Sequence, residues 1–121
     1  MQFYLELDPK IPDLYFESSA FAGAGKYLDS VADQLKIKSV FELFSYAAQN
    51  GLCPPGYEET EVPWFVPQEG IDWLEVVISH IRANPTVVEC PEQLVQDLTE
   101  CQDVLRKAKA AGSRWHFAMD I

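Results

Sequence analysis

The sequence predicts an α+β fold in which about four helices, the last two an antiparallel hairpin, pack on a small antiparallel sheet formed by the N- and C-terminal strands. Two observations predict it. Both ends of the chain alternate apolar and polar residues with the period of a strand, and between them apolar residues recur every three or four positions, as in helices. The 121 residues contain no repeat or break in composition, so a single globular domain over residues 1–121 is expected.

Two terminal segments have strand character. Residues 3–7 and 114–121 each place their apolar side chains on one face, with His116 on the other face of the second strand. The apolar positions are Phe3, Leu5, Leu7, Trp115, Phe117, Met119 and Ile121. A two-stranded ribbon is only marginally stable in water, so a third strand is predicted at Leu14–Glu17.

Two helices are expected after these strands. The first begins near Gly25, where apolar residues follow at helical spacing. The second begins at Ser39, which forms a capping-box pattern with Glu42, and should end at Asn50-Gly51. Residues 52–66 then form the longest irregular connection, rich in proline.

A helical hairpin is predicted for the second half. Its first helix runs from near Pro67 to Asn84-Pro85, where proline disfavours further helix, and it is apolar on two sides, as central helices are. Its second helix runs from Pro91 to about Ala111 and carries a heptad-like apolar seam at Leu94, Leu98, Cys101, Leu105 and Ala108. The same seam offers a possible homodimer contact, as does an edge of the sheet.

The charge narrows the classes of partner. The formal net charge of -10 disfavours binding to nucleic acid and to anionic membranes, because both rely on cationic side chains. No apolar run approaches the ~20 residues of a membrane helix, and the first residues lack a signal-peptide pattern. Three cysteines at unrelated spacings suit reduced thiols. These features predict a cytoplasmic protein.

Motifs for cofactors and metals are lacking. The segment 22–26, Ala-Gly-Ala-Gly-Lys, has Ala20 where a phosphate loop needs glycine and Tyr27 where it needs Ser or Thr. It is interpreted as a flexible turn before a helix. The cysteines and histidines show no closely paired zinc spacing. Neither a cofactor nor a metal is therefore expected.

The sequence favours a non-catalytic protein without excluding an enzyme. It has no nucleophile elbow, and Ser79 and His80 point about 100° apart on a helix. His80 and His116 remain weak catalytic candidates if the fold brings them together beside a carboxylate. The alternative function is therefore a small-molecule-binding protein or enzyme with a cleft near these two histidines.

The stretch Glu58 to Gly70 places two aromatic residues, Trp64 and Phe65, among carboxylates. It lies within a region from Lys38 to Arg82 that has no other Lys or Arg. The pair can pack inward against Trp73, line a small-ligand pocket with Tyr57, or form an exposed hot spot that attracts a basic partner. The leading hypothesis is a protein-interaction or regulatory, immunity-like module that binds a basic protein. The predicted binding residues are Trp64, Phe65, Glu58, Glu59, Glu61, Glu69 and Trp73.

Overall fold

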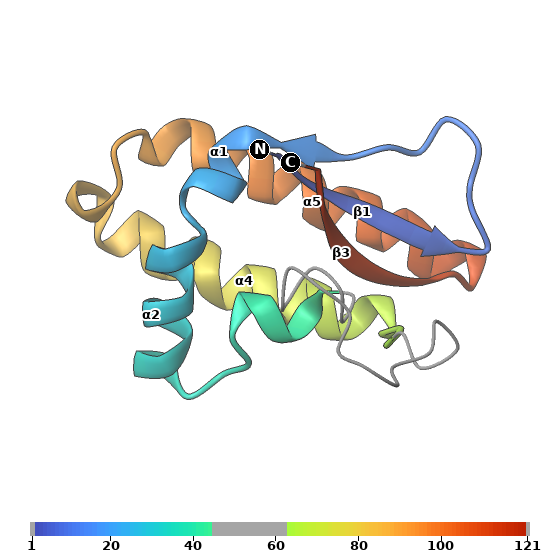
Figure 1. The fold of residues 1–121 in the computed structure, drawn as a ribbon, viewed down its shortest axis with the longest axis horizontal. Helices are drawn as coiled ribbons and strands as arrows, with labels where there is room; N and C mark the ends of the chain where they lie inside the picture. Colours follow the sequence, from blue (N-terminus) through green and yellow to red (C-terminus); the bar gives the residue numbers. More distant parts are fainter. Residues whose placement is uncertain (1, 45–62, 121) are drawn as a thin grey trace.

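The computed structural model describes residues 2–44 and 63–120 and confirms the α+β fold (Figure 1). A three-stranded antiparallel sheet has the order β2-β1-β3, so the first and last strands are neighbours. The elements are β1 (Gln2–Asp8), β2 (Glu17–Ser18), α1 (Ser19–Gly23), α2 (Gly25–Leu35), the 3-10 helix η1 (Val40–Leu43), α4 (Pro67–Ala83), the 3-10 helix η3 (Pro85–Val87), α5 (Pro91–Ala111) and β3 (Arg114–Asp120).

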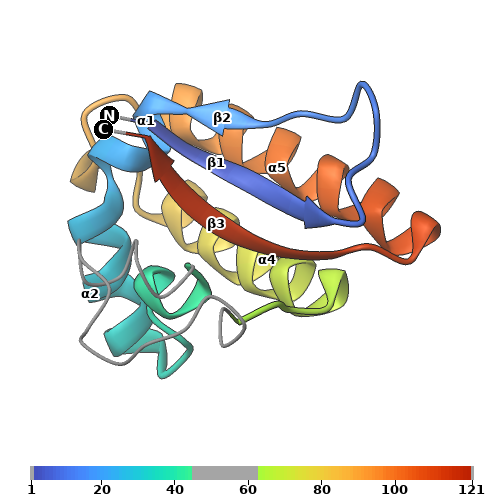
Figure 2. The ribbon, with the colours of Figure 1, turned by 45° about the vertical axis from the view of Figure 1, so that its right-hand side comes forward.

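The pairing of β1 with β3 organises the sheet. It runs in unbroken register from Gln2 opposite Asp120 to Asp8 opposite Arg114. Figure 2 shows the long hairpin of α4 and α5 behind these strands, covering one face of the sheet. The apolar faces of β1 and β3 are buried, as the alternation predicts.

The third strand differs slightly from its prediction. Only Glu17 and Ser18 pair with β1, instead of Leu14–Glu17. The strand ends at Ser18, because the Ser18 hydroxyl accepts a hydrogen bond from the Phe21 amide and so caps the start of α1. The chain leaves the sheet as soon as this helix begins.

The glycine-rich segment is helical on both sides instead of a flexible turn. Helix α1 ends at Gly23 and α2 begins at Gly25, with only Ala24 between them. Gly25 lies against the Phe3 ring, since a β-carbon there would approach it to 3.3 Å. A close packing contact with β1 therefore accounts for this glycine.

The helix predicted from Ser39 is much shorter. The capping box of Ser39 and Glu42 is confirmed, but only Val40–Leu43 are helical and Phe44 is extended. The Phe44 ring packs 4.7 Å from Phe3 and its backbone bridges to β3. This aromatic packing draws the chain out of the helix, and the remaining predicted residues, 45–51, lie outside the described part.

The apolar seam of α5 is used within the chain. Leu94, Leu98 and Leu105 are buried in the core against α4 and the sheet. They therefore offer no free face for a homodimer. Among the described residues no helix is long and apolar enough to cross a bilayer.

Replacement of Gly70 should destabilise the protein more than replacement of any exposed glycine. A β-carbon at Gly70 would lie 2.5 Å from the Trp115 ring and 2.6 Å from Leu105, both buried. We expect Gly70→Ala to lower the free energy of unfolding by about 3 kcal/mol in urea titrations. The matched control is Gly23→Ala, which meets no atom within 4 Å and should be neutral or slightly stabilising. Equal changes in the free energy of unfolding for the two variants would contradict the close approach of α4 to the Trp115 ring.

The thiol of Cys101 should be unreactive in the folded protein. Burial raises its pKa well above the ordinary value of 9.0, because the thiolate loses solvation. The folded chain then keeps a proton that the unfolded chain releases. The free energy of unfolding is therefore unaffected by this thiol below about pH 9 and falls as the pH rises further. In Cys53→Ser/Cys90→Ser, thiol labelling near pH 8 should require denaturant. Rapid labelling without denaturant would contradict the burial.

Candidate functional site

The segment 63–66 lies against β3 as a short additional edge. The amide of Phe65 donates to the Trp115 carbonyl at 2.8 Å, and the Trp115 amide donates back at 3.0 Å. The Trp115 indole also donates to the Val66 carbonyl at 2.9 Å. Because neighbouring side chains on extended backbone point to opposite faces, Trp64 and Phe65 lie on different sides of the sheet.

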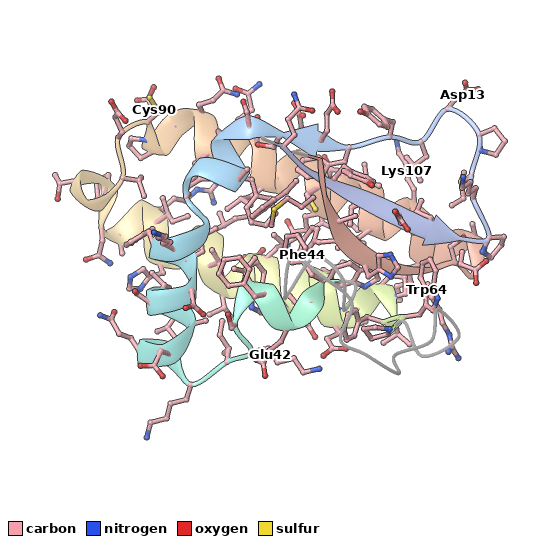
Figure 3. The ribbon with its side chains drawn as sticks, viewed as in Figure 1. Asp13, Glu42, Phe44, Trp64, Cys90 and Lys107 are labelled. Atoms are coloured by element: carbon pink, nitrogen blue, oxygen red, sulfur yellow. The ribbon has the colours of Figure 1, made fainter. Side chains whose placement is uncertain are left out.

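Trp64 covers His116. The two rings are stacked with centroids 4.1 Å apart, and the histidine is only 2% exposed. His116 lies opposite Glu6 in the β1–β3 ladder, and its Nε2 is 2.9 Å from a Glu6 carboxylate oxygen. Figure 3 shows Trp64 near β3 at the side of the molecule away from Cys90.

Both hydrogen bonds of His116 can form in two ways: with a proton on each ring nitrogen, or with one proton on Nδ1 and another on the Glu6 carboxylate. Nδ1 lies 3.0 Å from the Pro63 carbonyl, which can only accept, so Nδ1 donates. Nε2 faces a carboxylate, and a proton must lie between them for a hydrogen bond to form. The arrangement leaves no free nitrogen for acid or base chemistry.

On the opposite side, three predicted binding residues meet around Lys38. Its ammonium group is 2.6 Å from Glu69 and lies over the Phe65 ring, 5.1 Å from the centroid. The Trp73 indole donates to the Lys38 carbonyl at 2.8 Å. Lys38 thus joins the segment before η1 to both Phe65 and α4, an arrangement that its place in the sequence does not indicate.

A small hollow opens beside Lys38. Its volume is about 240 Å³, with apolar walls from Ile37, Leu43, Trp73 and Val76. Glu69 and Asp72 provide carboxylates at the same place. Val76 is 41% exposed, so the second apolar side predicted for this helix is not buried along its whole length. We call Lys38, Phe65, Glu69, Asp72, Trp73 and Val76 the Lys38 surface.

The other predicted site residues are distributed as follows. Trp64 and Phe65 are half-buried, while Trp73 is buried with 6% exposure. His80 lies on α4 about 15 Å along the helix from Gly70, which contacts Trp115, so the two histidines do not meet. Four further candidates lie outside the described residues: Tyr57, Glu58, Glu59 and Glu61.

Larger hollows lie elsewhere on the described part of the chain. One of about 560 Å³ runs between α4 and α5 near their connecting turn. Another of about 450 Å³ lies beside Tyr27 and Cys90. Burial raises the pKa of Tyr27, whose enclosed hydroxyl has no hydrogen-bond partner among the residues that the structure describes. Within residues 2–44 and 63–120, no three His, Cys, Asp or Glu side chains form a group that could hold a metal ion.

Comparisons with known proteins identify no relative. No model of a protein family, no curated protein and no solved structure matches the chain. The surfaces of the protein therefore carry the evidence for its function.

The two histidines should differ sharply in their contribution to stability. His116→Ala removes the stacked ring and both hydrogen bonds from a buried position, so we expect a loss of about 3 kcal/mol in the free energy of unfolding. His80→Ala, at a half-exposed helix position, should change it by less than about 0.5 kcal/mol. Urea titration of both variants provides the comparison, and similar losses would contradict the structural role of His116.

Proposed function

We propose that the protein is a non-catalytic interaction module that binds a basic protein through the Lys38 surface. The observation that carries this proposal is the convergence of Phe65, Glu69 and Trp73 around one lysine, beside an apolar hollow with an exposed valine. An apolar centre with a polar rim is the usual anatomy of a protein interface. A regulatory or immunity-like role is consistent with binding of this kind.

The size of the hollow supports a protein partner. Pockets for small molecules usually enclose about 300–1,000 Å³, more than the 240 Å³ found here. One apolar side chain of a partner can fill such a space and contact Trp73 and Val76. Because Lys38 is already paired with Glu69, its charge does little to repel a cation that approaches Asp72.

The net charge supports a basic partner. A protein with a formal charge of -10 attracts cationic surfaces over long distances at low salt. Asp72 lines the hollow and is exposed. Its attraction to Lys or Arg side chains would orient the partner before its apolar residue enters the hollow.

The alternative, a ligand-binding protein or enzyme near His80 or His116, has less support. His116 does lie beside a carboxylate, but its nitrogens are both engaged and it is almost fully buried. Neither histidine lines any of the hollows described above. A reaction at this place would require Trp64 to move away from the histidine ring.

Substitutions on the Lys38 surface should abolish partner binding without unfolding the protein. The test is affinity capture from the native lysate at low and high salt, with wild type, Val76→Asp and Asp72→Lys. We expect a basic protein that wild type retains, that salt releases and that both variants retain at least about tenfold less, since an apolar anchor or a rim charge is lost.

The matched control is Asp33→Lys, which makes the same charge change on α2 at an exposed position. It should retain the partner nearly as well as wild type. Capture of the same protein by wild type, Val76→Asp and Asp72→Lys alike would refute the Lys38 surface as the binding site. Thermal melting of each variant establishes that it is folded.

A further inference from the structure

A separate groove lies between α4 and α5, on the other side of α4 from the Lys38 surface. With a volume of about 560 Å³, it is the largest of the hollows described here. Its walls include Ile81, Pro85, Pro91 and Val95. The Thr99 hydroxyl donates to the Val95 carbonyl within α5, which leaves the threonine methyl group for the groove. The floor is therefore apolar.

The rim of this groove is charged asymmetrically. Glu92, Gln96 and Glu100 are exposed at steps of four residues and form one row along α5. The row spans about 12 Å, or two helical turns. Arg82 lies on the α4 side. None of the three charged residues forms an ion pair with another described residue, so each is free to pair with a partner.

The surrounding sequence strengthens this asymmetry. Residues 83–105 contain no Lys or Arg and five carboxylates, so the first half of α5 presents a negative potential with no internal cation. A ligand that fits the groove must therefore be apolar in its centre and positive on the side that faces α5.

We propose that this groove binds an amphipathic helix of another protein. The helix would place a row of apolar side chains between α4 and α5, and a row of Lys or Arg side chains over Glu92 and Glu100. A groove between two antiparallel helices, about two turns long, matches apolar side chains spaced at i, i+3 or i+4 and i+7 on such a helix. This proposal does not depend on the Lys38 surface.

The packing argues against a second copy of the chain as the occupant. Clustered basic residues do occur near the end of α5, at Arg106, Lys107 and Lys109. However, the apolar residues of that segment, Leu105 and Ala108, are fully buried in its own core. A second copy would supply cations there without an apolar row to enter the groove.

The probe is a synthetic peptide of about 18 residues, long enough to form a helix, with Leu on one face and Lys elsewhere. Its control has the same composition in an order without helical periodicity. Fluorescence anisotropy at low salt measures affinity, and amide NMR shifts locate the site. We expect the periodic peptide to bind at least about tenfold more tightly and to shift the amides of Arg82, Val95, Gln96 and Thr99.

Two matched pairs of variants test the groove itself. Glu100→Lys should weaken peptide binding roughly fivefold, while Asp33→Lys, with the same charge change on α2, should weaken it less than about twofold. Val95→Asp should weaken it at least about tenfold, while Val76→Asp on the Lys38 surface should not. Thermal melting confirms folding, and Glu100→Lys, at an exposed helix position, keeps the test valid if Val95→Asp unfolds.

Several results would overturn the proposal. Equal affinity for the two peptides would show that charge alone drives binding. Equal effects within each pair of variants, or NMR shifts away from the groove, would place the site elsewhere.

Other results would identify a different occupant of the groove. If sedimentation shows that the wild-type protein is a dimer and that Glu100→Lys dissociates it, the occupant is a second copy. A hydrophobic dye that binds the groove when neither peptide does would indicate a small ligand. None of these results tests whether a partner binds to the Lys38 surface.

Discussion

The buried ring of Trp115 holds three distant parts of the chain in place. The indole ring lies against Gly70, which has no side chain to intervene, so α4 approaches the sheet closely. Its indole nitrogen bonds to the Val66 carbonyl, and its backbone pairs with Phe65. The position of Trp64 over His116 and of Phe65 beside Lys38 both follow from these contacts. A shift of this one ring would displace the start of α4 together with both aromatic residues that precede it.

Local patterns predicted most of the fold, because strands and helices are set by neighbouring residues. The alternation in residues 3–7 and 114–121 places the right side chains in the core, and the capping box of Ser39 and Glu42 forms as expected. The errors occur where distant contacts decide. Phe44 leaves its helix because it packs against Phe3 and Phe117, which no local pattern indicates.

The candidate site was predictable only in part. Composition singled out Phe65, Glu69 and Trp73, but not Lys38, which brings them together through a charge, a ring contact and a backbone carbonyl. Alternation placed His116 on the outer face of its strand, and its ring does point away from the helices. Its burial depends on Trp64 and Glu6, and the latter lies 110 residues away along the chain. Sequence spacing carries no information about such a meeting.

The antiparallel pairing of β1 with β3 also has a consequence for the order of assembly. The central strand β1 can pair with β3 only after residues 114–120 have been synthesised, because the register joins Gln2 to Asp120. Closing so long a loop is entropically costly and slow compared with forming a helical hairpin from neighbouring segments. On the ribosome, α4 and α5 can therefore pair while β1 still lacks its neighbour β3. Until residues 114–120 have been made, the backbone N–H and C=O groups on this edge of β1 have no strand to pair with, and such an edge is where another extended chain can add.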